Sequence, residues 1–358
     1  MPDFTLPPLP PDVDLESPAV LKHAVKASRA LAELKGISKT IPNQSILIDT
    51  LPLLEAKDSS EIENIITTHD EIYKQELFRQ TIESAAAKEV SNYGQALREG
   101  YFSVKEKGLL TNNQLLEIHA LIEENRAGFR KLPGTELKNQ TSGETVYTPP
   151  QDHQAIVQLM TNLERVINEP EAWPVDPLIK MTVIHYQFES IHPFYDGNGR
   201  VGRILNILYL VKEGLLDMPV LYLSRYVIKN KGGYYRGLQR VRTHQEWEEW
   251  VLYLLKGVEE TALFTSQLVS GIQSLMHQTK TRIRSELGSL YSQDLLNNLF
   301  RHPYTKIDYL AEELGKSRQT ASKYLDQLVQ HGFLLKVTKG KHNYYINEPL
   351  FELFARAE

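Results

Sequence analysis

The sequence predicts a mainly α-helical protein with a small β-hairpin beside a helical core and a winged helix-turn-helix domain near its C-terminal end. Three observations predict this fold class. Apolar residues recur every three or four positions on both sides of a glycine-rich stretch at 191–203, which is typical of two amphipathic helices joined by a loop. Glycines and prolines interrupt the helical pattern between 129 and 150. After residue 292, three short helical patterns precede a hairpin pattern.

The length and composition of the chain limit the classes of protein to consider. At 358 residues the chain is long for one hydrophobic core, and we expect divisions into 1–110, 111–285 and 286–358. The formal net charge of -5 gives no overall attraction to nucleic acid or acidic membranes, although a local basic face is compatible with it. The absence of cysteine excludes disulfides, thiol nucleophiles and Cys-ligated metal sites.

The N-terminal residues lack a basic-then-apolar signal segment, and no apolar run in the chain is long enough to span a membrane. We therefore expect a cytoplasmic protein with no membrane partner. The prolines of residues 1–20 predict an extended arm, followed by a helix from Leu21 to about Gly36 and a buried apolar run at 46–54. Residues 70–126 have a helical pattern throughout, in which Thr111 caps a helix that runs from 115 to about 125.

The stretch between the two central helices concentrates groups that suit phosphate. The second helix is predicted to start near Gly199, where unpaired amides and the macrodipole favour an anion. Arg200 and Arg203, three positions apart on one face of that helix, suit phosphate oxygens. Asp196 is an oxygen ligand of the kind that Mg²⁺ prefers beside phosphate. The imidazole of His192 can take a proton from a hydroxyl group near neutral pH.

Each of these residues alone has an ordinary structural explanation, such as a turn or a solvated charge, and only their conjunction favours catalysis. No Lys-Ser or Lys-Thr pair follows the glycines, so the stretch is not a P-loop. A helix and not a strand precedes it, which excludes a dinucleotide fingerprint. Together the residues indicate transfer of a phosphate-bearing group from a Mg-nucleotide to an alcohol.

The same stretch resembles the full signature of the Fic family of protein adenylyltransferases. The resemblance rests on His192, Pro193, Phe194, Tyr195, Asp196, Gly197, Asn198, Gly199, Arg200, Val201, Gly202 and Arg203. It implies a Fic-type helical core that transfers AMP from MgATP to a Ser, Thr or Tyr hydroxyl of a protein substrate, so that ATP and Mg²⁺ are the small molecules required.

The resemblance also implies a role for each signature residue. His192 would be the general base and Asp196 the Mg²⁺ ligand. Arg203 would lie nearest the γ-phosphate. The catalytic set would be His192, Asp196, Asn198, Arg200 and Arg203. The nucleotide would be held by His192, Gly197, Asn198, Gly199, Arg200, Val201, Gly202 and Arg203.

The segment 58–66 has two interpretations. From spacing alone, Ser60 and Glu63 form a capping box at the start of a helix. The pattern of Ser59, Glu63 and Asn64 also resembles the inhibitory helix that some Fic proteins carry before their core, and there the glutamate pairs with the second arginine of the signature, here Arg203. We expect Glu63 to occupy the seat of the γ-phosphate and to inhibit the enzyme.

Two further sites follow from the resemblance. Thr145, Val146 and Tyr147 form a β-prone run whose plain interpretation is a surface hairpin; they also resemble the family's flap, which holds a target segment by strand addition. Tyr234 and Tyr235 match the paired aromatic position near the nucleotide base. Tyrosines at a helix start more often pack in a core, so adenine contact and core packing both stay open.

The C-terminal residues predict a helix-turn-helix with helices at 294–300, 307–314 and 318–331, followed by a hairpin from 333 to 346. Lysine and arginine exceed aspartate and glutamate only slightly between 292 and 347, so DNA binding and protein docking remain alternatives. The residues expected to face outward on the third helix are Arg318, Gln319, Ser322 and Lys323.

Three alternatives to an autoinhibited adenylyltransferase remain at this level. The fold could remove AMP, with Glu63 aligning water, or it could move another phosphate-linked group. The chain could also be a DNA-binding regulator in which the core only senses a ligand. Apolar helical surfaces are compatible with a homodimer. The target protein, its modified residue and the signal that relieves inhibition are not encoded in any recognisable motif.

Overall fold

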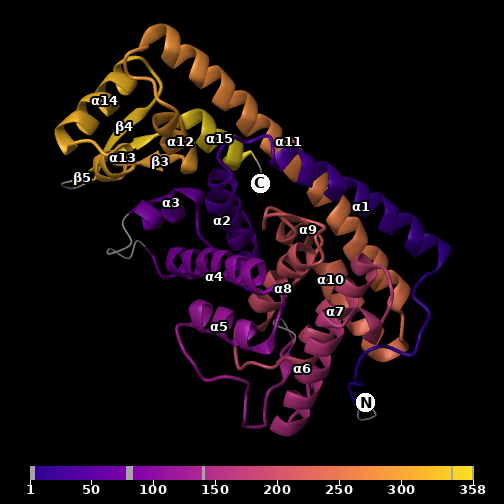
Figure 1. Ribbon diagram of the computed structural model, residues 1–358. Coiled ribbons are helices and arrows are strands. Elements are labelled where there is room, and N and C mark those ends of the chain that lie inside the picture. The colour runs from indigo at the N-terminus through magenta and orange to yellow at the C-terminus, as the bar shows by residue number, and fades with distance from the viewer. Residues whose placement is uncertain (1–4, 78–83, 139–141, 340–341, 357–358) are drawn as a thin grey trace.

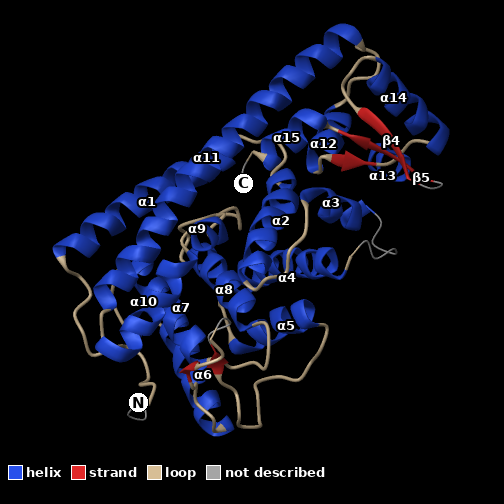
Figure 2. Cartoon of the chain, turned by 180° about the vertical axis from the view of Figure 1, so that it is seen from behind, coloured by secondary structure: helices blue, strands red, loops and turns tan. Residues whose placement is uncertain are grey.

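The protein is built almost entirely from helices, as Figures 1 and 2 show for the computed structural model, which describes residues 5–77, 84–138, 142–339 and 342–356. This confirms the predicted fold class. Two central helices, α7 (Pro177–Ile191) and α8 (Asn198–Lys212), are joined by the signature loop. Nearly every residue of both helices is buried, so the loop between them is held by the most rigid part of the core.

The N-terminal arm and its first helix differ from the prediction at residues 18–20. Residues 5–17 are extended and lie on the core, where the backbone N–H of Leu9 donates to Asn162 Oδ1 at 2.7 Å. Helix α1 (Pro18–Ser38), however, begins before Leu21. The prediction was wrong here because a proline at the first helical position loses no hydrogen bond, and the side chain of Ser17 caps the helix. Helix α1 packs along α11 (Trp247–Glu286) (Figure 1).

Helix α2 (Ser45–Ile62) contains the whole buried apolar run at 46–54. The capping-box interpretation of Ser60 was therefore wrong. The helix starts much earlier than Ser60 and ends at Glu63, which is its C-terminal cap. The run from Ile46 onward has helical spacing, and Pro52 sits inside the helix without ending it. The inhibitory motif accordingly lies in the last turn of a helix and not in its first.

The region at 70–126 is helical with a break. Helix α3 (His69–Leu77) is followed by α4 (Ala85–Lys107) and α5 (Asn112–Glu123). Ile82, which also belongs to the predicted helical pattern, lies outside the described residues. Gly108, with φ of +66°, ends α4, and a capping box of Thr111 with Gln114 starts α5. The predicted helical region is thus divided into three helices, of which α4 and α5 pack against each other.

The remaining elements before α11 surround α7 and α8. A short antiparallel hairpin pairs β1 with β2, as the sequence predicted. The bounds are β1 (Leu137–Lys138), β2 (Thr145–Tyr147), α6 (His153–Asn168), a 3-10 turn (Pro170–Ala172), α9 (Ser224–Lys229) and α10 (Lys231–His244). Across the described residues, no helix combines the length and apolar character needed to cross a membrane.

The C-terminal part has a helix-turn-helix followed by a hairpin, in the predicted order. Its three-stranded sheet has the antiparallel order β3–β5–β4. The last helix, α15, was not foreseen. The bounds are α12 (Gln293–Arg301), β3 (Tyr304–Thr305), α13 (Ile307–Leu314), α14 (Arg318–Gln330), β4 (Leu335–Lys339), β5 (His342–Ile346) and α15 (Glu348–Ala355).

The C-terminal part rests on α2, whose last turn carries Ser59 and Glu63, and on α3 (Figure 1). Thr50 of α2, which is fully buried, donates its hydroxyl to the carbonyl of Arg301 at 2.8 Å. The guanidinium of Arg301 also pairs with Asp49 at 2.7 Å. Tyr304 donates its hydroxyl to Asp70 of α3 at 2.6 Å. Both α2 and α3 are therefore fixed on the side away from the signature loop.

Candidate active site

The signature loop is closed on itself by one side chain. Helix α7 ends at His192, whose backbone is left-handed with φ of 50°, and Gly197, with φ of 75°, precedes α8. The amide of Asn198 spans the turn: Oδ1 accepts from the N–H of Phe194 at 2.8 Å, and Nδ2 donates to the carbonyl of Phe194 at 2.9 Å. Asn198 thereby fixes the first turn of α8, where the first amides of a helix have no partner within it.

A buried arginine that the sequence reasoning missed holds the loop from behind. Arg130 is completely buried, and its Nε donates to the carbonyl of His192 at 2.7 Å. Its Nη2 donates to the carbonyls of Pro150 and Ile191. The only sequence signal is a single arginine within an irregular, proline-rich interval, and such residues usually lie in solvent.

Replacing Arg130 by methionine is expected to destabilise the fold by about 3 kcal/mol, because the carbonyls of His192 and Ile191 would lose a charged donor in the interior. Denaturant unfolding of the two proteins measures the difference. Arg126→Met, which changes an exposed arginine of the same loop, is the matched control. Equal unfolding midpoints for wild type and Arg130→Met would contradict the role described here.

The imidazole of His192 is neutral at physiological pH. Shielding from solvent lowers its pKa to about 4, and the guanidinium groups of Arg130 and Arg242 act in the same direction. A neutral imidazole can accept a proton, so the residue is in the protonation state that a general base needs.

Arg203 is almost fully buried and is enclosed by the end of α2. Its Nε donates to Ser59 Oγ at 2.7 Å, and its Nη2 donates to the carbonyl of Ser59 at 2.9 Å and to Glu63 Oε1 at 2.8 Å. Burial alone would lower the pKa of Arg203, but the carboxylate of Glu63 raises it above its usual value. Asn64 then takes a left-handed backbone with φ of 65° and turns the chain away.

Arg200 has different carboxylate partners from Arg203. It is buried, and its guanidinium pairs with Glu89 of α4 at 2.9 Å and with Glu123 of α5 at 2.6 Å. The two arginines of the signature are thus matched by carboxylates from three different helices, α2, α4 and α5. No sequence motif pointed to Glu89 or Glu123, because neither lies near the signature.

The glycines of the loop are needed where carboxylates approach the backbone. A side chain at Gly199 would overlap Glu63 Oε1. A Cβ at Gly197 would lie 2.6 Å from Glu123 Oε1. Gly202 faces Glu189, whose Oε1 would lie 2.5 Å from an added Cβ, and Val201 is completely buried, so its side chain packs in the core.

Asp196 lies exposed at the mouth of the loop. Its Oδ1 accepts from the N–H of Gly197 at 2.7 Å, which leaves its other oxygen open to solvent or a ligand. Within the described part of the chain, no group of three or more His, Asp or Glu residues could hold a metal ion by itself. A single carboxylate oxygen of Asp196 suits a hard cation that takes most of its ligands from phosphate and water, as Mg²⁺ does.

The hairpin is attached to the active-site helix through one tyrosine. Tyr147 of β2 is buried and donates its hydroxyl to the carbonyl of Ser190 at 2.8 Å, while the guanidinium of Arg242 lies 3.9 Å from the centre of its ring. Val146 is partly exposed, and the hydroxyl of Thr145 donates to Glu136 of the opposite side of the hairpin at 3.1 Å. The outer edge of β2 is thereby held close to His192.

The two tyrosines of α10 lie in different environments. Tyr234 is buried and its hydroxyl is 2.8 Å from His185 Nε2, so it packs in the core. Tyr235 is 47% exposed. Burial of its hydroxyl, and next the charge of Glu63, raise its pKa to about 12. Of the pair, only Tyr235 has a surface available to a ligand.

Glu55 fixes helix α2 on its inner side. The carboxylate is buried, accepts from the backbone N–H of Ser224 at 2.9 Å and from the Ser224 hydroxyl, and also accepts from Tyr93 at 3.3 Å. Burial raises the pKa of Glu55 to about 7, although the bonds from Ser224 act against this shift. This contact ties α2 to the start of α9.

The raised pKa of Glu55 predicts a pH dependence of stability. A carboxyl whose pKa is 4.5 in the unfolded chain and about 7 in the fold stabilises the protein below pH 4.5, and this contribution is lost as the pH rises through 7. Between pH 5 and pH 7.5 we expect wild type to lose on the order of 2 kcal/mol more than Glu55→Gln. Urea unfolding at both pH values, with Glu61→Gln as control, measures this; parallel changes in all three proteins would contradict it.

Comparison with protein-family models places the whole architecture in one family. The chain matches the Fic/DOC family N-terminal model over residues 21–102, the Fic/DOC family model over 109–210 and the model of the C-terminal domain of the SoFic-like protein adenylyltransferases over 275–350. The three ranges take up most of the chain. The chain belongs to the Fic/DOC family.

Curated relatives of this Fic/DOC chain are named as adenylyltransferases. A probable protein adenylyltransferase of Aquifex aeolicus (strain VF5) is 30% identical over 184 residues, which are 50% of this chain and 54% of that protein. The protein adenylyltransferase Fic of Aedes aegypti is 28% identical over 111 residues, 31% of this chain and 21% of that protein. The chain therefore spans about half, or less, of the length of the curated relatives that it matches.

Solved structures share the fold. A Fic family protein from Desulfovibrio desulfuricans G20 superposes with a TM-score of 0.58 at 18% identity, over 94% of this chain and 98% of that one. Fic-1 from C. elegans superposes with a TM-score of 0.54 at 20% identity, over 69% and 73% of the two chains. The first of these similarities covers the N-terminal helices and the C-terminal part as well as the central helices.

Proposed function

We propose that the protein is an adenylyltransferase that transfers AMP from MgATP to a hydroxyl group of a target protein and that Glu63 holds it inactive. The single observation that supports both halves is the ion pair of 2.8 Å between Glu63 and Arg203 beside the glycine-lined start of α8. A buried arginine near the N-terminal end of a helix is well suited to bind a phosphate group. A carboxylate in the same place occupies the anion's position.

The reaction would use groups already described. The free amides after Gly197 would bind the α- and β-phosphates, and Asp196 would hold a Mg²⁺ ion, which supplies charge neutralisation at the phosphates. His192 would take the proton of the target hydroxyl, whose oxygen attacks the α-phosphorus as pyrophosphate leaves. Tyr235 would contact the adenine, and the edge of β2 around Val146 would hold the target segment by strand addition.

The proposed inhibition rests on competition between the carboxylate of Glu63 and the γ-phosphate for the guanidinium of Arg203. The carboxylate of Glu63 and a γ-phosphate would both need the guanidinium of Arg203, and like charges this close repel strongly. With Glu63 in place the triphosphate would bind poorly or in a position that His192 cannot use. Ser59 supports the inhibited state. Its hydroxyl accepts a hydrogen bond from the Nε of Arg203 and so orients the guanidinium toward Glu63.

The test is the product of the purified protein with nucleotides. Intact mass spectrometry of the Glu63→Gly variant with MgATP is expected to show adducts of one AMP on the enzyme itself, and addition of lysate should yield AMP-modified target peptides. ATP labelled only at the γ-phosphate should leave no label on protein. Transfer of the γ-label, or removal of AMP from a modified protein without any transfer, would instead favour the alternatives of another phosphate-linked transfer or of de-AMPylation.

The C-terminal part is the proposed site of a regulatory partner. Arg318, Gln319 and Lys323 are exposed on the outer face of α14, which suits either DNA or an acidic protein surface. The divisions at 110 and 285, the cytoplasmic location and a homodimer stay predictions of the sequence. Retention of a cellular effect in His192→Ala, together with its loss in the pair Arg318→Ala and Lys323→Ala, would favour a regulator that binds through α14.

A further inference from the structure

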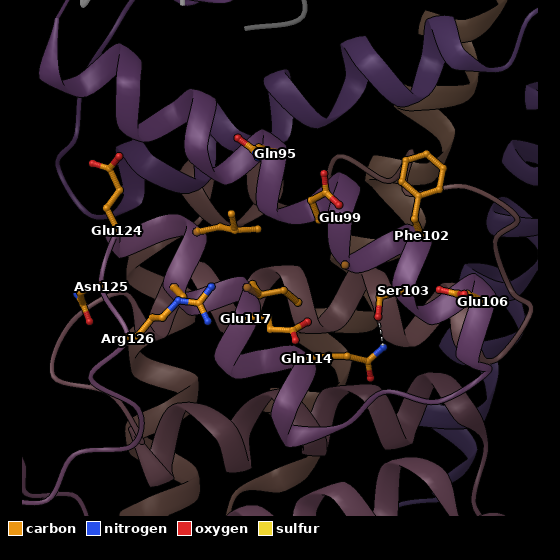
Figure 3. Close-up of a pocket in the computed structure, with 14 residues that line it drawn as sticks. Gln95, Glu99, Phe102, Ser103, Glu106, Gln114, Glu117, Glu124, Asn125 and Arg126 are labelled. Atoms are coloured by element: carbon orange, nitrogen blue, oxygen red, sulfur yellow. Dashed lines mark hydrogen bonds between the residues drawn. The ribbon is translucent and has the colours of Figure 1, made fainter.

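A groove of about 650 Å³ runs along the surface between α4 and α5 (Figure 3). Residues of α4 line it at helical spacing from Gln95 to Glu106, and residues of α5 line the other side from Gln114 to Glu124. The floor is closed where the two helices touch, since a Cβ at Gly100 would lie 3.0 Å from Ile118 Cδ1.

The rim of the groove is acidic. Glu99, Glu106 and Glu117 are exposed, and none of them forms an ion pair with a residue of the described chain. Glu124 is matched by Lys88 at 2.5 Å. Arg126 is the one positively charged lining residue, and it lies at the end of the groove (Figure 3). The groove therefore carries uncompensated negative charge along most of its length.

The wall also offers apolar surface. Phe102 is 55% exposed although its neighbour Tyr101 is buried, and Leu121 is half-buried on the facing helix. An exposed phenylalanine in a concave surface is a common anchor for a partner side chain, because its burial contributes more than that of most residues. Charge and shape thus agree on one class of occupant, a segment with lysine or arginine beside apolar residues.

The groove adjoins the signature loop through α5. The opposite face of α5 carries His119, whose ring stacks on Phe194 of the loop at 3.9 Å between centroids, and Glu123, which pairs with Arg200. The next residue, Glu124, already lines the groove. A chain lying in the groove is therefore separated from the catalytic loop by the width of a single helix.

We propose that this α4–α5 groove docks a basic, partly apolar segment of the target protein, which the active site then modifies at a hydroxyl group elsewhere on the same protein. The proposal rests on the function proposed above and adds the chemistry of the substrate. Docking would raise the effective concentration of the target hydroxyl beside His192 without any new contact at the reacting atoms. It would also select targets by charge, because an acidic segment would be repelled.

The first experiment measures binding alone. A fluorescein-labelled peptide with lysine and leucine at amphipathic helical spacing is titrated with the full-length protein and followed by anisotropy. We expect binding that weakens with salt and that becomes about tenfold weaker in the triple variant Glu99→Lys, Glu106→Lys, Glu117→Lys. The matched control reverses three exposed glutamates outside the groove: Glu33, Glu169 and Glu171. A peptide with glutamate in place of lysine should not bind.

The second experiment separates this proposal from the proposed function. In the Glu63→Gly background, self-modification and modification of lysate proteins are both followed by mass spectrometry. We expect the groove variant to keep self-modification and to lose most modification of other proteins, while the control variant keeps both. Unchanged peptide binding, or unchanged modification of other proteins in the groove variant, overturns the groove proposal. Absence of any AMP transfer in Glu63→Gly itself would overturn the enzymatic function. The peptide-binding experiment would still show whether the groove binds a basic segment.

Discussion

Replacing Glu63 by glycine is expected to raise the rate of AMP transfer by about 5- to 150-fold, the range in which one site usually controls another. The reason is local. The substitution removes the carboxylate that pairs with Arg203 at 2.8 Å and leaves the guanidinium, held by Ser59, free for a phosphate. The measurement is the initial rate of self-modification with MgATP, read by intact mass. ATP affinity, measured by calorimetry, should increase in the same variant.

The control for this variant is Glu61→Gly. It places the same flexible residue in the last turn of α2, but Glu61 faces Lys57 at 3.5 Å and not Arg203. Glu61 lies inside α2 and Glu63 is its cap, so Glu61→Gly weakens the helix end at least as much as Glu63→Gly, and a general loosening of α2 would activate both proteins. Activation restricted to Glu63→Gly is the expected result. Equal rates in wild type and Glu63→Gly would contradict the inhibitory role, even if both proteins transfer AMP.

Replacing His192 by alanine in the Glu63→Gly background is expected to lower the rate by about 10²- to 10⁴-fold, the usual contribution of a general base. ATP binding should remain, because the phosphates would be held by the α8 amides and Arg203. The left-handed backbone at His192, with φ of 50°, makes alanine a strained choice. His192→Asn is therefore the second variant, since asparagine tolerates this conformation and offers no comparable base.

The pH profile gives an independent check on His192. The lowered pKa of about 4 keeps the imidazole neutral throughout the physiological range. The rate in the Glu63→Gly background should therefore stay level as the pH falls from 7 to about 5 and decline only near 4. An ordinary exposed histidine would lose its base form near pH 6.5. A rate that halves near pH 6.5 would show that another group, or a reorganised histidine, takes the proton.

The parts of the fold that the sequence predicted well are those with strong local signals. Three such signals involve only residues close together in the chain. They are the helical period of α7 and α8, the capping box at Thr111 and the glycines and prolines before β2. The start of α8 could be placed within one residue, because Gly197 has no side chain to oppose a left-handed backbone. The start of α1 was misplaced for the opposite reason, since Pro18 was taken as a helix breaker in a position where proline is favourable.

The rest of the site depends on contacts between residues far apart in the chain. The resemblance predicted Glu63 as the partner of Arg203. It did not predict the partners of Arg200, Glu89 and Glu123, which lie on α4 and α5. The role of Arg130 is recognisable only in the folded structure. Its partners are backbone carbonyls, which every residue type carries, so no sequence pattern marks them. The capping-box interpretation of Ser60 was wrong because the pattern covers only four residues. The buried apolar run that precedes it already forms the helix that ends there.

The bare backbone at Gly199 has a consequence for how this site can change through mutation. A methyl group there would collide with the carboxylate of Glu63. Under the proposed function it would also reduce the room for the phosphates at the start of α8. The proposed inhibition and the proposed nucleotide binding therefore both depend on the absence of a side chain at position 199. Under the proposed function, a substitution at 199 would displace Glu63 and obstruct the nucleotide together. A substitution at position 63 would remove only the partner of Arg203 and leave the catalytic side chains in place, so inhibition could change while the chemistry stays the same.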